Sequence, residues 1–204
     1  MIRRAYEARD FARFSAHFFF YAGVRWCLII YDIGNRNLAD YVASMLSQFL
    51  RVEDLNRQAV TGEQLVYLID MVDELNRTES SEDAFDHHAH IGNYTLFLAG
   101  VFPDYLEYLS TYKKRLITRQ YYESMGSRHY GLAASHNTAR KEDLDAILTT
   151  LSSRFLNVRR ALTRLSVDYL VFNRSKAVQT YLSHPTMRPI LLHWQQSFLQ
   201  FIII

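Results

Sequence analysis

The sequence predicts an all-α protein, organised as a single-domain multi-helix bundle with long antiparallel helices over residues 1–204. Glycine and proline are scarce, with 7 and 3 residues in 204, whereas turn-rich all-β folds need many more of both. Apolar residues make up 49% of the chain and charged residues 22%, as in ordinary globular proteins. Helical periodicity recurs along the chain, and no repeat, low-complexity tract or domain linker divides it. One helical domain is therefore expected.

The first apolar stretch, "HFFFYAGVRWCLIIY", is expected to form a core helix rather than a signal peptide or a membrane span. His17 and Arg25 leave only seven uninterrupted apolar residues, Phe18 to Val24, and a transmembrane helix needs roughly 20. Cys27 is the only cysteine, which excludes an internal disulfide. A lone thiol in an apolar setting fits a reducing compartment, so a cytoplasmic location is predicted.

Three helices are expected between residues 38 and 101. The first, "NLADYVASMLSQFLRVEDL", has apolar residues at helical spacing, and Thr61 is a suitable N-cap for the second, "TGEQLVYLIDMVDELNR". Ser80 or Ser81 should cap the third, which should end near Val101 because Pro103 disfavours helical geometry at the residue before it. The apolar positions of the first helix are Leu38, Tyr41, Val42, Met45, Leu46, Phe49 and Leu50.

A long helix is expected from Pro103 through Ser135, where "SHNT" interrupts it, and Thr138 restarts the chain. The strongest periodic signal follows, because nine apolar residues keep four-three spacing and so share one stripe of one long helix. A bundle core explains this stripe better than a coiled-coil seam between chains, since bulky Phe155 and Tyr169 fit poorly in a narrow seam. The stripe comprises Leu144, Leu148, Leu151, Phe155, Val158, Leu162, Leu165, Tyr169 and Phe172.

The C-terminal piece "RPILLHWQQSFLQFIII" is strongly apolar. Such a segment should either dock on the body of the protein or mark a contact surface. A homo-oligomer, in the simplest case a homodimer, that forms through this C-terminal apolar helix is therefore one predicted partner.

Charge is unevenly distributed, although the net charge is only +2. Acids concentrate in residues 63–86, and bases concentrate in residues 113–140 and 154–176. Internal pairing between these segments is the favoured interpretation. Nucleic acid is not a predicted partner, since no helix-turn-helix pattern or aromatic-interleaved sheet accompanies the arginines.

The histidine-rich segment "FDHHAH" offers a candidate metal site. Helical spacing places Asp86, His87 and His90 at one end of a helix, and His129 lies on a second helix that could pack against it. Helical metal centres usually carry Glu-x-x-His units, and this chain has none. The favoured interpretation is an acidic helix start whose histidines pair with acids. A divalent metal at Asp86, His87, His90 and His129 is the secondary hypothesis, and no other cofactor is predicted.

The segment "YESMGSRHY" places Tyr122, Gly126 and Tyr130 one helical turn apart. A glycine within a helix costs about 1 kcal/mol relative to alanine, so a close helix–helix approach should compensate, with Gly100 as the opposing residue. The alternative is that this gap admits a ligand. The candidate pocket then comprises His90, Asn93, Phe97, Gly100, Tyr122, Gly126 and Tyr130.

The segment "HIGNYTLFLAGVFPDYL", His90 to Leu106, resembles one found in a family of uncharacterised bacterial all-helical proteins. In those proteins a His-Ile-Gly-Asp-aromatic start runs into Leu-Phe, a glycine and an aromatic-Pro pair. The resemblance extends over residues 38–172, including "ADYVASMLSQFL" and the tyrosine–glycine–tyrosine spacing, and it implies a bacterial helical protein without a known activity. Asn93 stands where the pattern carries Asp, and an amide cannot supply the carboxylate that acid or metal chemistry needs.

The sequence alone does not establish a biochemical function. Nucleophile motifs such as Gly-x-Ser-x-Gly and phosphate-cradling glycine loops are missing from it, so a non-catalytic role is favoured. Abundant aromatic helix faces indicate an interaction or small-ligand-binding helical domain. Two alternatives stay open: a metal-dependent enzyme with a His/Asp site between two helices, and a peripheral membrane-surface protein that binds through "FARFSAHFFFYAG".

Overall fold

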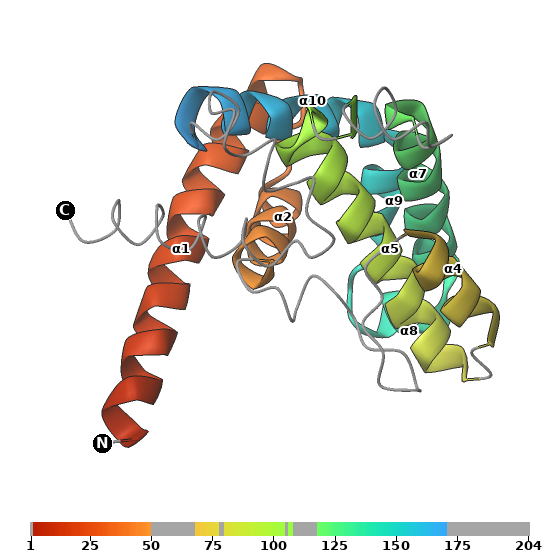
Figure 1. Cartoon of the computed structure of the whole chain (residues 1–204), viewed down its shortest axis with the longest axis horizontal. Helices are drawn as coiled ribbons and strands as arrows, with labels where there is room; N and C mark the ends of the chain where they lie inside the picture. The colour runs from red at the N-terminus through yellow and green to blue at the C-terminus, as the bar shows by residue number, and fades with distance from the viewer. Residues whose placement is uncertain (1, 50–67, 78–79, 105, 108–117, 171–204) are drawn as a thin grey trace.

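The computed structural model describes residues 2–49, 68–77, 80–104, 106–107 and 118–170, with side chains from Ala16 to Asp168. Every regular element within these ranges is a helix, and they contain no strand, which confirms the predicted all-α multi-helix bundle (Figure 1). The elements are α1 (Ile2–Ile30), α2 (Arg36–Gln48), α4 (Leu68–Arg77), α5 (Ser81–Val101), α7 (Arg119–Ser135), α8 (Asn137–Lys141), α9 (Asp145–Ser153), α10 (Phe155–Leu165) and a π-helical turn η1 (Ser166–Leu170).

Helices α1 and α2 form one side of the bundle. The chain turns between them at Asp32, which has a φ of 57°, and the side chain of Asn35 caps α2 by accepting the Leu38 N–H at 3.1 Å. Most of the predicted apolar face of α2 is buried, from Leu38 to Phe49. Leu50 and the predicted cap Thr61 lie outside the described residues. No helix in the described part of the chain is long and apolar enough to cross a membrane.

Helix α5 is the central helix of the bundle and ends where the sequence predicts. The hydroxyl of Ser80 caps its start by accepting the Asp83 N–H at 3.4 Å, and Phe102 leaves helical geometry at φ −125° and ψ 54° directly before Pro103. From Ile91 onward almost every residue of α5 is buried. Its main neighbour is α7, which runs antiparallel, since early residues of α5 contact late residues of α7.

The predicted single helix from Pro103 to Ser135 is wrong, because Thr118 interrupts it. Thr118 has extended geometry at φ −93° and ψ 160°, and its hydroxyl accepts the Tyr121 N–H at 3.1 Å. Threonine is a preferred N-cap, since its oxygen satisfies a backbone donor that the new helix leaves free. The predicted break near "SHNT" is present at His136, which ends α7 and whose ring accepts the Thr138 N–H at the start of the short α8.

The predicted stripe helix is interrupted, but its buried face is retained. Arg154, at φ −111° and ψ 18°, separates α9 from α10, and π-helical geometry replaces α-helix at Ser166. Hydroxyl groups explain the first break: Ser153 donates to the Thr149 carbonyl, while Ser152 and Ser127 each donate to the other's carbonyl at 2.8 and 2.9 Å. Such side-chain bonds to backbone compete with helical geometry. Leu148, Leu151, Phe155, Val158, Leu162 and Leu165 are buried; the Tyr169 side chain and Phe172 lie outside the described residues.

Candidate functional site

The predicted seam between α5 and α7 is organised around Asn93. Its side-chain oxygen accepts hydrogen bonds from the hydroxyls of Tyr130 at 2.8 Å and Tyr41 at 3.1 Å. Burial raises the pKa of Tyr41 to about 12 and raises the pKa of Tyr130 well above its ordinary value. Both phenols therefore stay protonated and act as donors near neutral pH, so the three side chains satisfy one another.

Glycines let the neighbouring helices approach this seam closely. A Cβ at Gly126 would lie 2.3 Å from the Phe155 ring and 2.4 Å from Thr95 Oγ1, and a Cβ at Gly92 would lie 2.7 Å from the Tyr130 ring. Gly100 instead faces α10: a Cβ at Gly100 would lie 2.8 Å from the Cβ of Leu162. The prediction that Gly100 opposes Gly126 is therefore wrong: each glycine accommodates a bulky side chain from another helix.

The remaining candidate pocket residues are placed in packed surroundings. His90 is 8% exposed and packs edge-on against Phe49, which also contacts Phe97, and Tyr122 is 3% exposed. The structure thus brings the seven predicted residues into the α5–α7 core and its α2 and α10 borders. None of the seven lines either of the two cavities described below.

The histidines pair differently from the predicted metal site. Nδ1 of His129 lies 2.9 Å from Nδ1 of His88, while Nδ1 of His87 lies 2.7 Å from the backbone oxygen of Asp83. Within the described ranges, no three His, Cys, Asp or Glu side chains are grouped so that they could hold a metal ion. Asp86, His87, His90 and His129 are therefore not brought together as one ligand set.

The pair His88–His129 is neutral at pH 7. Burial lowers the pKa of His129 to about 4, and the neighbouring His88 ring and Arg128 guanidinium add to this effect; burial also lowers the pKa of His88. The 2.9 Å contact between two Nδ1 atoms requires that one ring donates and the other accepts, so the two rings take complementary tautomers. His88 was not among the predicted site residues, because helical spacing alone does not show which of two adjacent histidines faces the next helix.

A cavity of about 500 Å³ lies beside the N-terminal half of α7 and α10. Its volume is within the usual range for small-molecule sites, which is about 300–1,000 Å³. Three arginines and two glutamates give the lining a formal charge of +1. The lining residues are Leu106, Glu107, Arg119, Gln120, Glu123, Leu156, Arg159 and Arg160.

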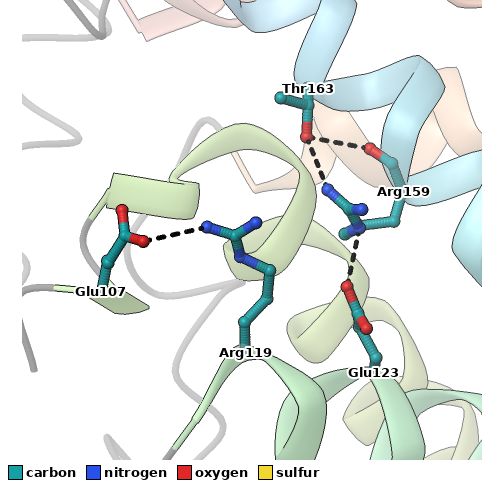
Figure 2. A network of polar contacts seen from close by, with 5 residues as sticks. All are labelled: Glu107, Arg119, Glu123, Arg159 and Thr163. Carbon is teal, nitrogen blue, oxygen red and sulfur yellow. Dashed lines mark hydrogen bonds and ion pairs between the residues drawn. The ribbon is translucent and has the colours of Figure 1, made fainter. Parts of the chain in front are cut away.

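The charged side chains of this arginine cavity form two separate ion pairs, in which Arg119 and Arg159 extend from different helices toward different glutamates (Figure 2). Arg159 Nε lies 2.9 Å from Glu123 Oε1, and its Nη1 donates to Thr163 Oγ1 at 3.4 Å. Arg119 Nη2 lies 3.7 Å from Glu107 Oε1. The Arg159–Glu123 pair is largely buried, with side chains 10% and 19% exposed, whereas the Arg119–Glu107 pair is open to solvent.

Two donor groups of these arginines make no well-aligned hydrogen bond within the described part of the chain. The Nε–H groups of Arg119 and Arg159 are buried and make no hydrogen bond to any described residue; the Arg159 N–H is misaligned with Glu123 despite the short distance. Among the described side chains, only one other buried nitrogen or oxygen atom makes no hydrogen bond, namely Nη1 of Arg25 on α1. An unsatisfied buried donor costs about 1–3 kcal/mol, and more when it is charged, so an acceptor oxygen in the cavity would be stabilised.

The electrostatics of the cavity also favour an anion. Burial lowers the pKa of the Arg159 guanidinium; Glu123 opposes this effect, and the neighbouring Arg119 and Arg160 add to it. Like charges that gather around a buried group disfavour its charged form, and a bound anion would relieve that repulsion. The arrangement can therefore bind a carboxylate or phosphate with charge-assisted hydrogen bonds.

Sequence reasoning missed this cavity, although part of its signal was present. Arg119 and Glu123 have i,i+4 spacing on one helix face, and Arg159 and Arg160 belong to the noted basic stretch. The predicted ion pairs join the basic segments to the acids of residues 63–86. The two pairs of this cavity, Arg159–Glu123 and Arg119–Glu107, instead use acids outside that segment. Only the packing of α10 against α7 brings the arginines together.

A second cavity, of about 540 Å³, lies between α1, α2 and the turn after α8. Its charged lining residues are Arg36, Asp40, Glu142 and Asp143, so acids predominate there. Asp40 Oδ1 lies 3.2 Å from His17 Nε2. Its lining includes no buried donor without an acceptor among the described residues, and the arginine cavity is therefore the stronger candidate.

In comparisons with protein-family models, curated protein sequences and solved structures, nothing matches the chain. The family resemblance stays a prediction, and the function is argued from the geometry of the arginine cavity.

Proposed function

We propose that this protein is a helical small-ligand-binding domain and that its arginine cavity binds a small anion bearing a carboxylate or phosphate group. The observation that carries the proposal is the pair of buried Nε–H groups, from Arg119 and Arg159, that border one cavity without hydrogen-bond acceptors among the described residues. An anionic oxygen would accept from both groups and offset the excess positive charge. Arginine suits this role because its planar donor fork matches carboxylate and phosphate oxygens.

The proposal assigns binding rather than catalysis to the cavity. Both glutamates of the lining are already engaged in ion pairs with arginines, so neither carboxylate faces the cavity without a charged partner. The single domain and the cytoplasmic location belong to the same proposal, and they are supported by the uninterrupted helical pattern and the lone cysteine, respectively. A homo-oligomer through the C-terminal segment is the alternative to the packing of that segment within one chain, and it rests on the apolar C-terminal residues alone.

The test is a thermal-unfolding and calorimetric titration of the full chain with inorganic phosphate and with succinate, at constant ionic strength set by chloride. The expected result is a saturable rise in the unfolding midpoint, since a ligand that binds only the folded state stabilises it. Arg119→Gln should abolish the rise. Arg140→Gln, which removes an exposed arginine of α8 outside the cavity, should preserve it.

The proposal would be contradicted if both anions left the midpoint at the chloride value and gave no saturable heat. Equal responses of the Arg119→Gln and wild-type proteins would also place any binding elsewhere.

A further inference from the structure

The outer face of α1 is apolar without interruption. Between Ala16 and Ile30, every exposed residue is apolar, including Phe18 at 68% and Trp26 at 59% exposure. At 100° per residue these positions fall within about 120° of the helix circumference. The α1 apolar face comprises Phe18, Phe19, Ala22, Trp26, Ile29 and Ile30.

The opposite side of α1 is already packed on the bundle. Phe20, Val24 and Cys27 are fully buried there. A helix that is apolar on all sides normally lies inside a protein, and a contiguous exposed apolar face usually marks a surface that another element covers. The α1 apolar face therefore needs an occupant.

The described chain ends beside α1. Helix α10 packs on α1 so closely that a Cβ at Gly23 would lie 2.6 Å from Leu165 Cδ1. The charges of Arg164 and Asp168 act on the Cys27 thiol, whose pKa burial raises, so η1 also lies near α1. Figure 1 shows the blue end of α10 crossing the C-terminal half of α1. Residues 171–204 thus follow a described end that packs against α1, at the helix that carries the α1 apolar face.

The remaining sequence has the length and the pattern to cover this face. Residues 189–204 would span about 24 Å as a helix, against about 18 Å for the stretch from Phe18 to Ile30. Leu191, Trp194 and Phe198 recur at three- and four-residue spacing, with Phe201 and Ile202 continuing the stripe. Polar His193, Gln196 and Gln200 follow the same spacing on the other side. As a helix the segment would therefore have a polar sector, and Leu192, Leu199 and Ile203 would extend its apolar surface beyond this stripe.

We propose that residues 189–204 of the same chain pack on the α1 apolar face and complete the bundle. The inference is independent of the anion proposal. Tethering favours this occupant over a second copy or a lipid surface, because a linked segment acts at a millimolar effective concentration. The linker 171–188 reaches up to about 60 Å when extended, so it does not restrict the docking.

The two tryptophans of the chain provide the test, since Trp26 lies on the α1 apolar face and Trp194 in the proposed cover. In the full chain carrying Trp194→Phe, Trp26 is the only tryptophan. We expect blue-shifted emission and weak acrylamide quenching that do not change with protein concentration. Adding Phe198→Asp should raise the quenching constant several-fold, because it places a charge on the apolar stripe, while far-UV circular dichroism verifies that the other helices remain.

The matched control is His193→Asp, which places the same charge on the polar side and should leave the quenching unchanged. The proposal is overturned if Trp26 is readily quenched at every concentration. It is equally overturned if protection appears only as concentration rises, which identifies a second copy. Protection only upon addition of vesicles of phosphatidylcholine and phosphatidylglycerol overturns it as well and identifies a lipid surface.

Discussion

The two halves of helix α7 face different environments: one half packs in the protein interior, and the other borders the cavity for which we propose ligand binding. Its C-terminal half meets α5 in a closed seam, where Tyr130 and Asn93 satisfy each other and Gly126 admits the Phe155 ring. Its N-terminal half borders an open cavity, where Arg119 and Glu123 lie beside α10. The Phe155 ring fills the seam at Gly126, whereas the cavity holds both space and two arginine N–H groups without a well-aligned hydrogen bond among the described residues.

Residues that look unusual in a sequence need not mark a functional site. Histidines, a mid-helix glycine and paired tyrosines attract notice in a sequence, yet here their polar groups pair with one another or with backbone. Arginines and glutamates are ordinary surface residues in a sequence. Packing of α10 against α7 has partly buried them and left two donors unsatisfied. Changes in the seam should therefore affect stability, and changes in the cavity should affect binding.

The largest expected effect is the acid sensitivity of the seam at His129. Its folded pKa of about 4 lies below the unfolded value near 6.5, so the folded state binds fewer protons between these values. The free energy of unfolding should fall as pH drops from 6.5 to 4 and level off below, by about 3 kcal/mol in total. Urea unfolding of the wild-type and His129→Gln proteins between pH 6.5 and 4 measures this pH dependence. The difference between their free energies of unfolding should shrink as pH falls. Parallel curves would contradict the assignment.

Filling the gap at Gly126 should have the next largest effect. The new methyl group of Gly126→Ala would lie 2.3 Å from the buried Phe155 ring, and overpacking of this kind costs about 1–3 kcal/mol. Gly34→Ala is the control, since nothing lies within 4 Å of its Cβ position. Chemical denaturation should show a loss of about 2–3 kcal/mol for the first variant and none for the second. Equal stabilities would show that the seam is loosely packed.

Removing the acceptor at Asn93 should have a somewhat smaller effect. Asn93→Leu leaves the hydroxyls of Tyr41 and Tyr130 without this partner, at a cost of about 2 kcal/mol. Tyr41→Phe removes only one donor and leaves the Tyr130 bond in place, so its cost should be about 1 kcal/mol. Both values follow from the midpoints of urea unfolding. A larger loss for Tyr41→Phe than for Asn93→Leu would contradict the central role of the Asn93 oxygen.

Disrupting the cavity should change stability least. Arg119 is 40% exposed and its glutamate partner 69% exposed, and such open ion pairs contribute about 0–1 kcal/mol. Arg119→Gln should therefore unfold within about 0.5 kcal/mol of wild type while losing the phosphate-dependent rise in midpoint. A variant that unfolds like Gly126→Ala would place Arg119 in the structural core instead.

Much of the fold could be predicted from the sequence, because helix signals are local. The Ser80 cap, the end at Val101 before Pro103 and the buried stripe from Leu148 to Leu165 all follow from spacing and capping rules. The breaks at Thr118 and Arg154 could not be predicted. A threonine is tolerated inside helices as well as at caps, and the Ser152–Ser127 exchange needs the tertiary structure.

The candidate site was beyond prediction for a similar reason. The seven predicted pocket residues lie on α5 and α7, but whether a seam between two helices closes depends on side chains from other helices. Phe155 and Leu162 fill the spaces at Gly126 and Gly100. The arginine cavity depends on residues near 107, 119–123 and 156–160, which are separated along the chain and carry no motif.

The most direct test of the central claim is to observe the Nε–H groups of Arg119 and Arg159 by nuclear magnetic resonance during a phosphate titration. Arginine-to-lysine variants at each position assign the two signals. We predict that both signals are protected from water exchange and shift saturably with phosphate, while backbone amides of the α5–α7 seam stay in place. Static arginine signals, or shifts confined to the seam, would contradict the claim that the ligand binds in the arginine cavity.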